Sequence, residues 1–143
     1  MTTLIYKDEE LTQSLIKIIR KAGQAIIKVY NSDFDYGFKK DLSPLTQADT
    51  ISHQIIKEEI QKITPDIPIL SEEDCKVPFE ARSKWTQYWL VDPLDGTKEF
   101  INRNGEFTVN IALIEKNSPI LGVIHIPVKN ETFWGSKVHG SFF

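Results

Sequence analysis

Cysteine is almost missing from this sequence, with Cys75 as its one occurrence in 143 residues. That count excludes an intrachain disulfide and a metal site built from several cysteines, and it is compatible with a reduced compartment. Long apolar runs are missing too, because no stretch approaches the length of a membrane span. The first residues turn acidic by Asp8 and resemble neither a signal peptide nor an anchor. We therefore expect a cytoplasmic protein.

Positive charge is not in excess either. The 17 lysines and arginines are outnumbered by 20 aspartates and glutamates, which gives a net charge of -3. The sequence therefore lacks the basic footprint of a nucleic-acid-binding protein, and no nucleic-acid partner is expected. An anionic small molecule would need local help from a metal ion or from the free N–H groups at a helix start.

Helical spacing of apolar residues marks two segments in the first half of the chain. The first runs from about Asp8 to Tyr30. The second is expected to begin near Thr46 as N-cap, since Pro44 disfavours a helical residue before it, and to end at Pro65. Asp49 would then lie in the first turn of this helix, where a favourable interaction with the helix dipole is sufficient to explain an acidic residue.

Segments rich in β-branched and apolar residues dominate the second half. The continuous apolar run from Tyr88 to Val91 predicts a strand buried on both faces. Loops are expected over residues 31–43 and 75–84, and further strands over residues 67–70, 108–114, 119–126 and 131–134. Helices followed by mostly adjacent strands indicate an α+β fold rather than a doubly wound sheet.

The densest chemistry lies in residues 92–97, which read Asp-Pro-Leu-Asp-Gly-Thr. The preceding strand is expected to end at Asp92, because the proline that follows cannot donate to further pairing. Asp92 and Asp95 would then sit at the carboxyl end of a strand, beside a helix start whose N–H groups can bind phosphate. Glu72 and Glu73 follow another strand-like segment. If the two segments are neighbours, three or four carboxylates meet in one place.

Such a cluster of carboxylates is costly without a cation. Two unit charges about 4 Å apart repel by roughly 4 kcal/mol at an effective dielectric of about 20. Oxygen ligands without histidine or cysteine suit Mg²⁺, Mn²⁺ or Ca²⁺ rather than zinc. A bound metal can bridge to a substrate phosphate and lower the pKa of water. Metal-assisted hydrolysis of a phosphate ester is therefore the chemistry that such a site supports best.

Each part of this pattern also has an ordinary structural explanation. Asp-Pro-x-Asp-Gly is good turn material, residues 72–74 suit a solvated acidic loop, and Thr97 can simply cap its helix. Their combination favours a site. An EF-hand is excluded, because Leu94 and Arg103 stand at its third and twelfth positions. Phosphatases with a nucleophilic aspartate carry one residue between their two acids, whereas this chain has two.

Residues 92–97 match in full the Asp-Pro-[Ile/Leu]-Asp-Gly-Thr signature of the inositol monophosphatase superfamily. The wider run through Ile114 resembles the bacterial 3'(2'),5'-bisphosphate nucleotidases, as do three other segments in the same order, 43–49, 69–73 and 122–127. The resemblance extends from about residue 10 to the end of the chain. It implies the N-terminal portion of an inositol-monophosphatase-like layered α/β sandwich, with two helices packed on a largely antiparallel sheet.

The resemblance also implies a missing part. Family members run to nearly twice this length, so residues 1–143 are expected to form an N-terminal metal-binding domain without its C-terminal domain. That second domain supplies a further metal-binding aspartate from a Trp-Asp motif, whereas here Trp134 is followed by Gly135. Strand faces and edges that the second domain would cover are expected to be exposed, which predicts self-association.

A metal-ligand set follows from the resemblance by position. Two or three magnesium ions are expected in the complete fold. Glu72, Asp92 and the Leu94 carbonyl would hold the first ion, and Asp92 and Asp95 would contribute to the second.

The resemblance likewise implies which groups act on the substrate. Asp49 and Thr97 would orient and activate the attacking water, with Glu72 close to both the water and the phosphate. The backbone N–H groups of Gly96 and Thr97 would bind the phosphate. Lys39 is either a counter-charge near the site or a solvated lysine.

The implied activity is magnesium-dependent and lithium-sensitive hydrolysis of adenosine 3',5'-bisphosphate to AMP and phosphate by metal-activated water, linked to sulfur assimilation. One alternative is a sugar phosphatase of the inositol monophosphatase type. Another is a truncated remnant that binds metal without turnover. The resemblance also implies a capacity for peripheral association with the bacterial inner membrane, which no residue here indicates.

Overall fold

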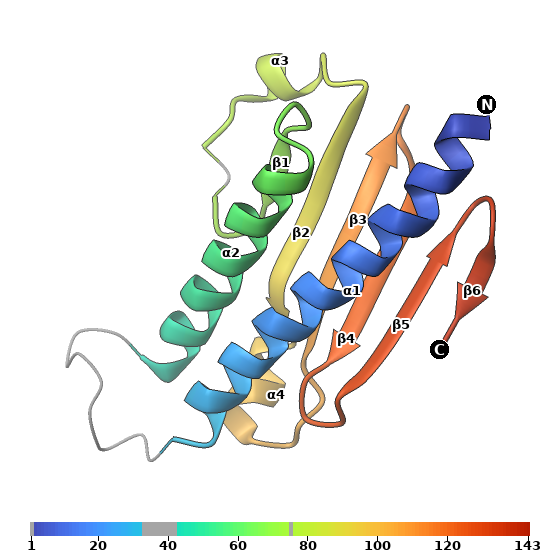
Figure 1. Ribbon diagram of the computed structural model, residues 1–143. Coiled ribbons are helices and arrows are strands. Elements are labelled where there is room, and N and C mark those ends of the chain that lie inside the picture. Colours follow the sequence, from blue (N-terminus) through green and yellow to red (C-terminus); the bar gives the residue numbers. More distant parts are fainter. Residues whose placement is uncertain (1, 33–42, 75) are drawn as a thin grey trace.

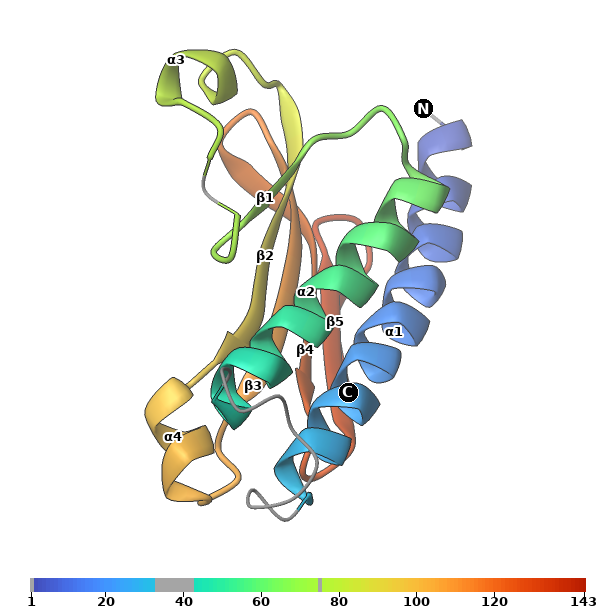
Figure 2. The same ribbon diagram turned by 90° about the vertical axis from the view of Figure 1, so that its left-hand side faces the viewer.

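Helices and sheet form two layers (Figure 1). The computed structural model describes residues 2–32, 43–74 and 76–143. Helix α1 (Thr2–Tyr30) and helix α2 (Pro44–Ile63) lie side by side on one face of the sheet in both Figure 1 and Figure 2. The predicted α+β fold, with two helices packed on a largely antiparallel sheet, is confirmed.

Within the described residues the sheet has six strands, whose order in space is their order in the chain. The first two strands are parallel, and all later neighbours are antiparallel. The strands are β1 (Ile69–Ser71), β2 (Gln87–Asp95), β3 (Thr108–Glu115), β4 (Ser118–Ile126), β5 (Glu131–Ser136) and β6 (Gly140–Phe142). Each predicted strand is present. Strand β6, which has three residues, was not predicted from the sequence.

The hydrophobic core lies between the helices and the sheet. Alternate residues of β2, such as Trp89 and Val91, point toward the helices and are buried, and α1 contributes Leu15 and Ile26 to the same core. Leu90 points the other way and keeps 42% of its surface exposed. The prediction that this strand is buried on both faces was therefore wrong, because α1 and α2 cover only one face of the sheet.

The N-cap of helix α2 lies three residues earlier than predicted. Ser43 is its N-cap, with the Ser43 hydroxyl accepting the Thr46 N–H at 3.1 Å, and Pro44 occupies the first turn. Proline suits this position because its fixed φ is already helical and its missing N–H would have no partner there. Asp49 therefore lies beyond the first turn, and the dipole explanation for its acid was wrong.

Two short helices flank the second strand. Helix α4 (Thr97–Asn102) confirms the predicted helix after residue 96, whereas α3 (Phe79–Arg82) lies in a segment expected to be a loop. Residues 33–42, which include Lys39, lie outside the described residues. No described helix has both the length and the apolar character needed to cross a membrane.

Candidate metal and phosphate site

A bulge in β2 brings the two predicted metal-binding aspartates to one place. Asp92 pairs with Asn110 and Asp95 with Thr108, so two residues of β2 oppose one residue of β3. Within this bulge the Asp92 Oδ1 atom accepts the Leu94 N–H at 3.3 Å. The prediction that pairing stops at Asp92 was wrong, because the proline falls inside the bulge, where the ladder needs no N–H.

Gly96 turns the chain from this bulge into α4. Its φ of 89° is left-handed, and a Cβ there would lie 3.2 Å from the Phe107 Cα atom. Both features favour glycine. Phe100 anchors α4 in the core, with its ring centroid 5.2 Å from that of Phe107 and 5.4 Å from that of Tyr30. Thr97, the first helical residue, is exposed beside the bulge.

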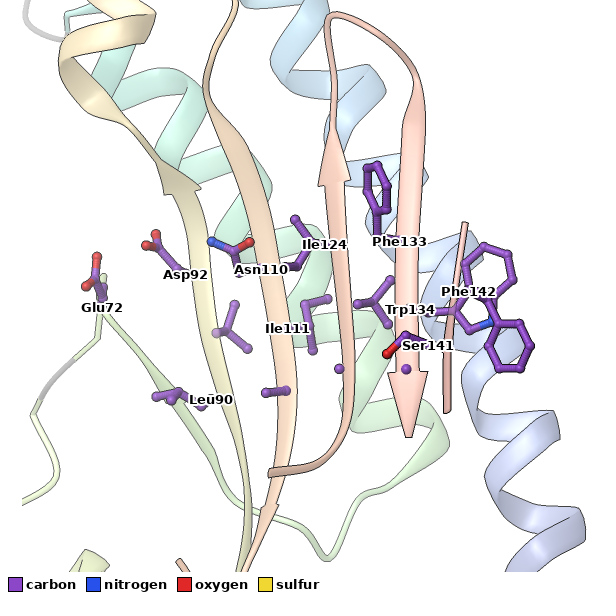
Figure 3. Close-up of a pocket in the computed structure, with 15 residues that line it drawn as sticks. Glu72, Leu90, Asp92, Asn110, Ile111, Ile124, Phe133, Trp134, Ser141 and Phe142 are labelled. Carbon is purple, nitrogen blue, oxygen red and sulfur yellow. The ribbon is translucent and has the colours of Figure 1, made fainter. Parts of the chain in front are cut away.

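Glu72 reaches the site from the neighbouring strand. Its N–H donates to the Val91 carbonyl at 3.2 Å, which extends the parallel pairing of β1 and β2 by one residue. Figure 3 shows Glu72, Asp92 and Asn110 at one end of a groove of about 650 Å³, on the sheet face opposite the helices. The Asn110 amide donates to Asp95 Oδ2 at 3.3 Å.

Helix α2 presents three side chains, spaced four residues apart, to the loop formed by residues 71–74. Such spacing places side chains on one face of a helix. The three contacts are a hydrogen bond between Asp49 and Glu73, one between His53 Nδ1 and Ser71 Oγ at 2.9 Å, and an ion pair between Lys57 Nζ and Asp74 Oδ2 at 3.5 Å.

The acidic side chains of this region interact electrostatically with one another. Burial raises the pKa of the Asp49 carboxyl to about 7, with the charge of Glu73 and the hydrogen bond to Glu73 acting in the same direction. Burial also raises the pKa of Asp92 to about 6, together with the charges of Glu72 and Asp95. We call the mutually interacting acids the carboxylate cluster: Asp49, Glu72, Glu73, Asp92 and Asp95.

The donor set of the carboxylate cluster fits a magnesium ion. Its oxygen-only chemistry suits a hard cation, and added positive charge would offset the burial and the repulsion that together raise the pKa of Asp92. Among the described residues, however, no three acid, histidine or cysteine side chains already form a metal-binding group. The expected carboxylates are therefore close enough to interact electrostatically, but they do not form a preassembled set of metal ligands. Magnesium tolerates this, since it keeps several waters and needs only one or two carboxylates.

Sequence reasoning omitted two residues that the structure places at the site. Glu73 was expected among the meeting carboxylates, but its contact with Asp49 was not predicted. His53 stands one helical turn after Asp49, and that spacing was the available signal. Asn110 had no signal, because its place beside Asp95 depends on the register between β2 and β3.

Replacing Asp49 with asparagine is expected to make the metal-free chain progressively more stable than wild type as the pH rises from about 5 to 8. A carboxyl whose pKa is raised on folding, from 3.8 to about 7 here, holds its proton more tightly in the folded state. Its contribution to stability is complete below the unfolded pKa and is lost as the pH passes through the folded pKa. Urea denaturation of both proteins across this pH range measures the effect.

The comparison with wild type is needed because other groups titrate in the opposite sense. Burial lowers the pKa values of His53 and His125, and this favours the folded state as the pH rises. Subtracting one denaturation series from the other removes the contribution that the two proteins share. A stability difference that stays constant from pH 5 to pH 8 would contradict the prediction.

Comparison with known proteins gives a consistent result. A model of the inositol monophosphatase family matches residues 7–143. The 3'(2'),5'-bisphosphate nucleotidase CysQ of Salmonella typhimurium is 50% identical over 129 residues, which are 89% of this chain and 52% of that protein. CysQ of Escherichia coli strain K12 is 52% identical over 122 residues, 84% of this chain and 49% of that protein.

Solved structures agree with these relatives. The crystal structure of CysQ from Bacteroides thetaiotaomicron superposes with a TM-score of 0.84 at 41% identity, covering 96% of this chain and 49% of that one. An inositol monophosphatase from Thermotoga maritima gives a TM-score of 0.70 at 29% identity, with 100% and 51% covered. The chain thus spans about half the length of the curated relatives it matches.

Proposed function

The chain belongs to the inositol monophosphatase family, and from that premise we propose that it hydrolyses a phosphate monoester of a nucleoside bisphosphate. The substrate we propose is adenosine 3',5'-bisphosphate, which would give AMP and phosphate. The observation that carries the proposal is the identity of 50–52% to proteins named 3'(2'),5'-bisphosphate nucleotidase, over a stretch that contains the carboxylate cluster. Residues 1–143 would be the N-terminal metal-binding domain of such an enzyme.

We propose that the carboxylate cluster holds magnesium. Glu72, Asp92 and the Leu94 carbonyl would take the first ion, and Asp92 and Asp95 would contribute to a second. Support comes from the joining of Glu72 to β2 beside Asp92, and from the bulge that puts Asp95 on the same edge. When bound, magnesium supplies positive charge to the phosphate oxygens and makes water more acidic.

Asp49 and Thr97 are the proposed partners of the attacking water. Support comes from the position of Asp49 on α2, where it contacts Glu73 and interacts with Asp92, and from that of Thr97 at the start of α4 beside the bulge. Asp49 would take the proton as the water oxygen bonds to phosphorus and the ester P–O bond breaks, and the ribose oxygen would leave as part of AMP and take a proton from solvent. Thr97 would orient the same water, Glu72 would lie beside it, and the N–H groups of Gly96 and Thr97 would hold the phosphate.

Two alternative functions are distinguished from the proposed one by the experiment below. A sugar phosphatase is favoured by the fold shared with inositol monophosphatases, although the identity there is lower, 29% for the Thermotoga maritima enzyme. A metal-binding remnant is favoured by the coverage of only about half of each relative. A cytoplasmic location, self-association, lithium inhibition and a role in sulfur metabolism stay predictions.

Phosphate release from adenosine 3',5'-bisphosphate tests the proposal. We expect the purified chain to release phosphate only with Mg²⁺, to be inhibited by Li⁺, and to prefer this substrate to inositol 1-phosphate. Asp95→Asn serves as the inactive control. Folded chain that binds Mg²⁺ without releasing phosphate would instead identify a metal-binding remnant, and a preference for inositol 1-phosphate would identify a sugar phosphatase.

A further inference from the structure

The segment that carries Glu72 is weakly held by the sheet itself. β1 is three residues long and lies at the edge of the sheet, paired on one side with β2. Short edge strands open easily, because few hydrogen bonds hold them. A proposed metal ligand that directly follows such a strand needs support from another element if its position is to be reproducible.

Helix α2 supplies that support through Ser71. Ser71 is the last residue of β1, is only 2% exposed and pairs with Val91 across the ladder. Its hydroxyl lies 2.9 Å from His53 Nδ1 and also accepts the Glu73 N–H at 3.4 Å. The hydrogen bonds from His53 and from the Glu73 N–H to the Ser71 hydroxyl hold the residues on both sides of Glu72.

The other two contacts of α2 fall on either side of His53. Asp49 reaches Glu73 one turn earlier, and Lys57 pairs with Asp74 one turn later. The Lys57 pair is partly exposed and therefore weak, and Asp49 is proposed to act on water. His53 is thus the side chain of this face that hydrogen-bonds to the buried end of β1.

We propose that His53 is a positioning residue for Glu72. It touches neither metal nor substrate; it holds the Ser71 hydroxyl, and through it the end of β1, so that Glu72 stands beside Asp92. The proposal rests on the proposed function for its consequence, which is tighter binding of magnesium. Its structural part, the position of Glu72, is measurable without metal.

Removing the imidazole is therefore expected to make the backbone at Glu72 less stable, and through that change to weaken magnesium binding. In His53→Leu, the Glu72 amide should exchange its hydrogen about 5- to 10-fold faster, the effect of losing one net hydrogen bond. Apparent magnesium affinity should fall by roughly 10-fold, the lower end for groups that orient metal ligands. His53→Asn, whose short amide can still reach Ser71, should restore both values.

Amide hydrogen exchange by NMR and magnesium titration by calorimetry, both on the full chain, make the test. Ser71→Ala removes the same hydrogen bond from its other end, together with the longer one from the Glu73 N–H, and Gln54→Ala is the matched control on the exposed side of α2. We expect Ser71→Ala to change both values at least as much as His53→Leu, and the double variant to add little to Ser71→Ala. Gln54→Ala should behave as wild type.

The outcomes separate this proposal from the proposed function. Unchanged exchange at Glu72 in folded His53→Leu or Ser71→Ala would overturn the positioning role, as would an asparagine variant as defective as the leucine variant. Should His53→Leu fail to fold, Ser71→Ala decides. Faster exchange at Glu72 in a chain whose wild type binds no Mg²⁺ would support the positioning role and overturn the metal site.

Discussion

Replacing Asp92 with asparagine is expected to abolish magnesium-dependent phosphate release while making the metal-free chain more stable. The carboxylate is a proposed ligand to both ions, so its loss should cost about 100-fold or more in activity, at or beyond the upper end for residues that merely support metal ligands. Stability should rise near pH 7.5, because burial, together with the charges of Glu72 and Asp95, raises the pKa of Asp92 to about 6 and acts against its ionised form.

The substitution keeps the local geometry. Asparagine retains the Oδ1 atom that accepts the Leu94 N–H, so the bulge in β2 should persist. Phosphate release and the urea midpoint at pH 7.5 are the two measurements, with Asp66→Asn as an exposed control of the same chemistry outside the cluster. A variant that is both less active and less stable would contradict the electrostatic explanation and indicate a structural role for the carboxylate.

The meeting of acids from two distant segments could be predicted from the sequence. Asp92 and Glu72 each follow an apolar segment, and parallel neighbours end at the same edge of a sheet, so their approach needed only that the two strands pair. The pairing of β1 with β2 meets that condition. The bulge could not be predicted in the same way, because the alignment of Asp95 with Thr108 depends on the register of β3.

The contribution of α2 was harder to predict, because it depends on where the helix starts and on how it packs. A start near Thr46 gave Asp49 a sufficient explanation in the helix dipole, and that explanation concealed its contact with Glu73. The exposed face of the sheet was hidden for a related reason. An apolar run such as residues 88–91 reports burial without saying which face is covered, and Leu90 and Phe133 line the open groove in Figure 3.

Replacing Gly23 with alanine is expected to destabilise the chain by about 2 kcal/mol or more, although alanine is the better helix former by about 1 kcal/mol. Gly23 lies in α1 against the sheet, where an added Cβ would stand 2.5 Å from His125 Cδ2 and 2.7 Å from Nε2. His125 is 1% exposed, and its Nδ1 lies 2.9 Å from Thr132 Oγ1, which also accepts the Arg20 Nε–H at 3.1 Å. The ring therefore cannot move aside without breaking a buried network.

Urea denaturation of Gly23→Ala measures this loss, and Gly122→Ala is its matched control. A Cβ at Gly122 meets only the Ile111 carbonyl at an ordinary 3.8 Å, so that change should be nearly neutral. The contact itself is isolated by repeating Gly23→Ala in a His125→Ala background, where the smaller side chain makes room for the new methyl group. There the penalty should vanish and the helix propensity of alanine should show as a gain. An equal loss in both backgrounds would place the cause in α1 itself rather than in its packing against His125.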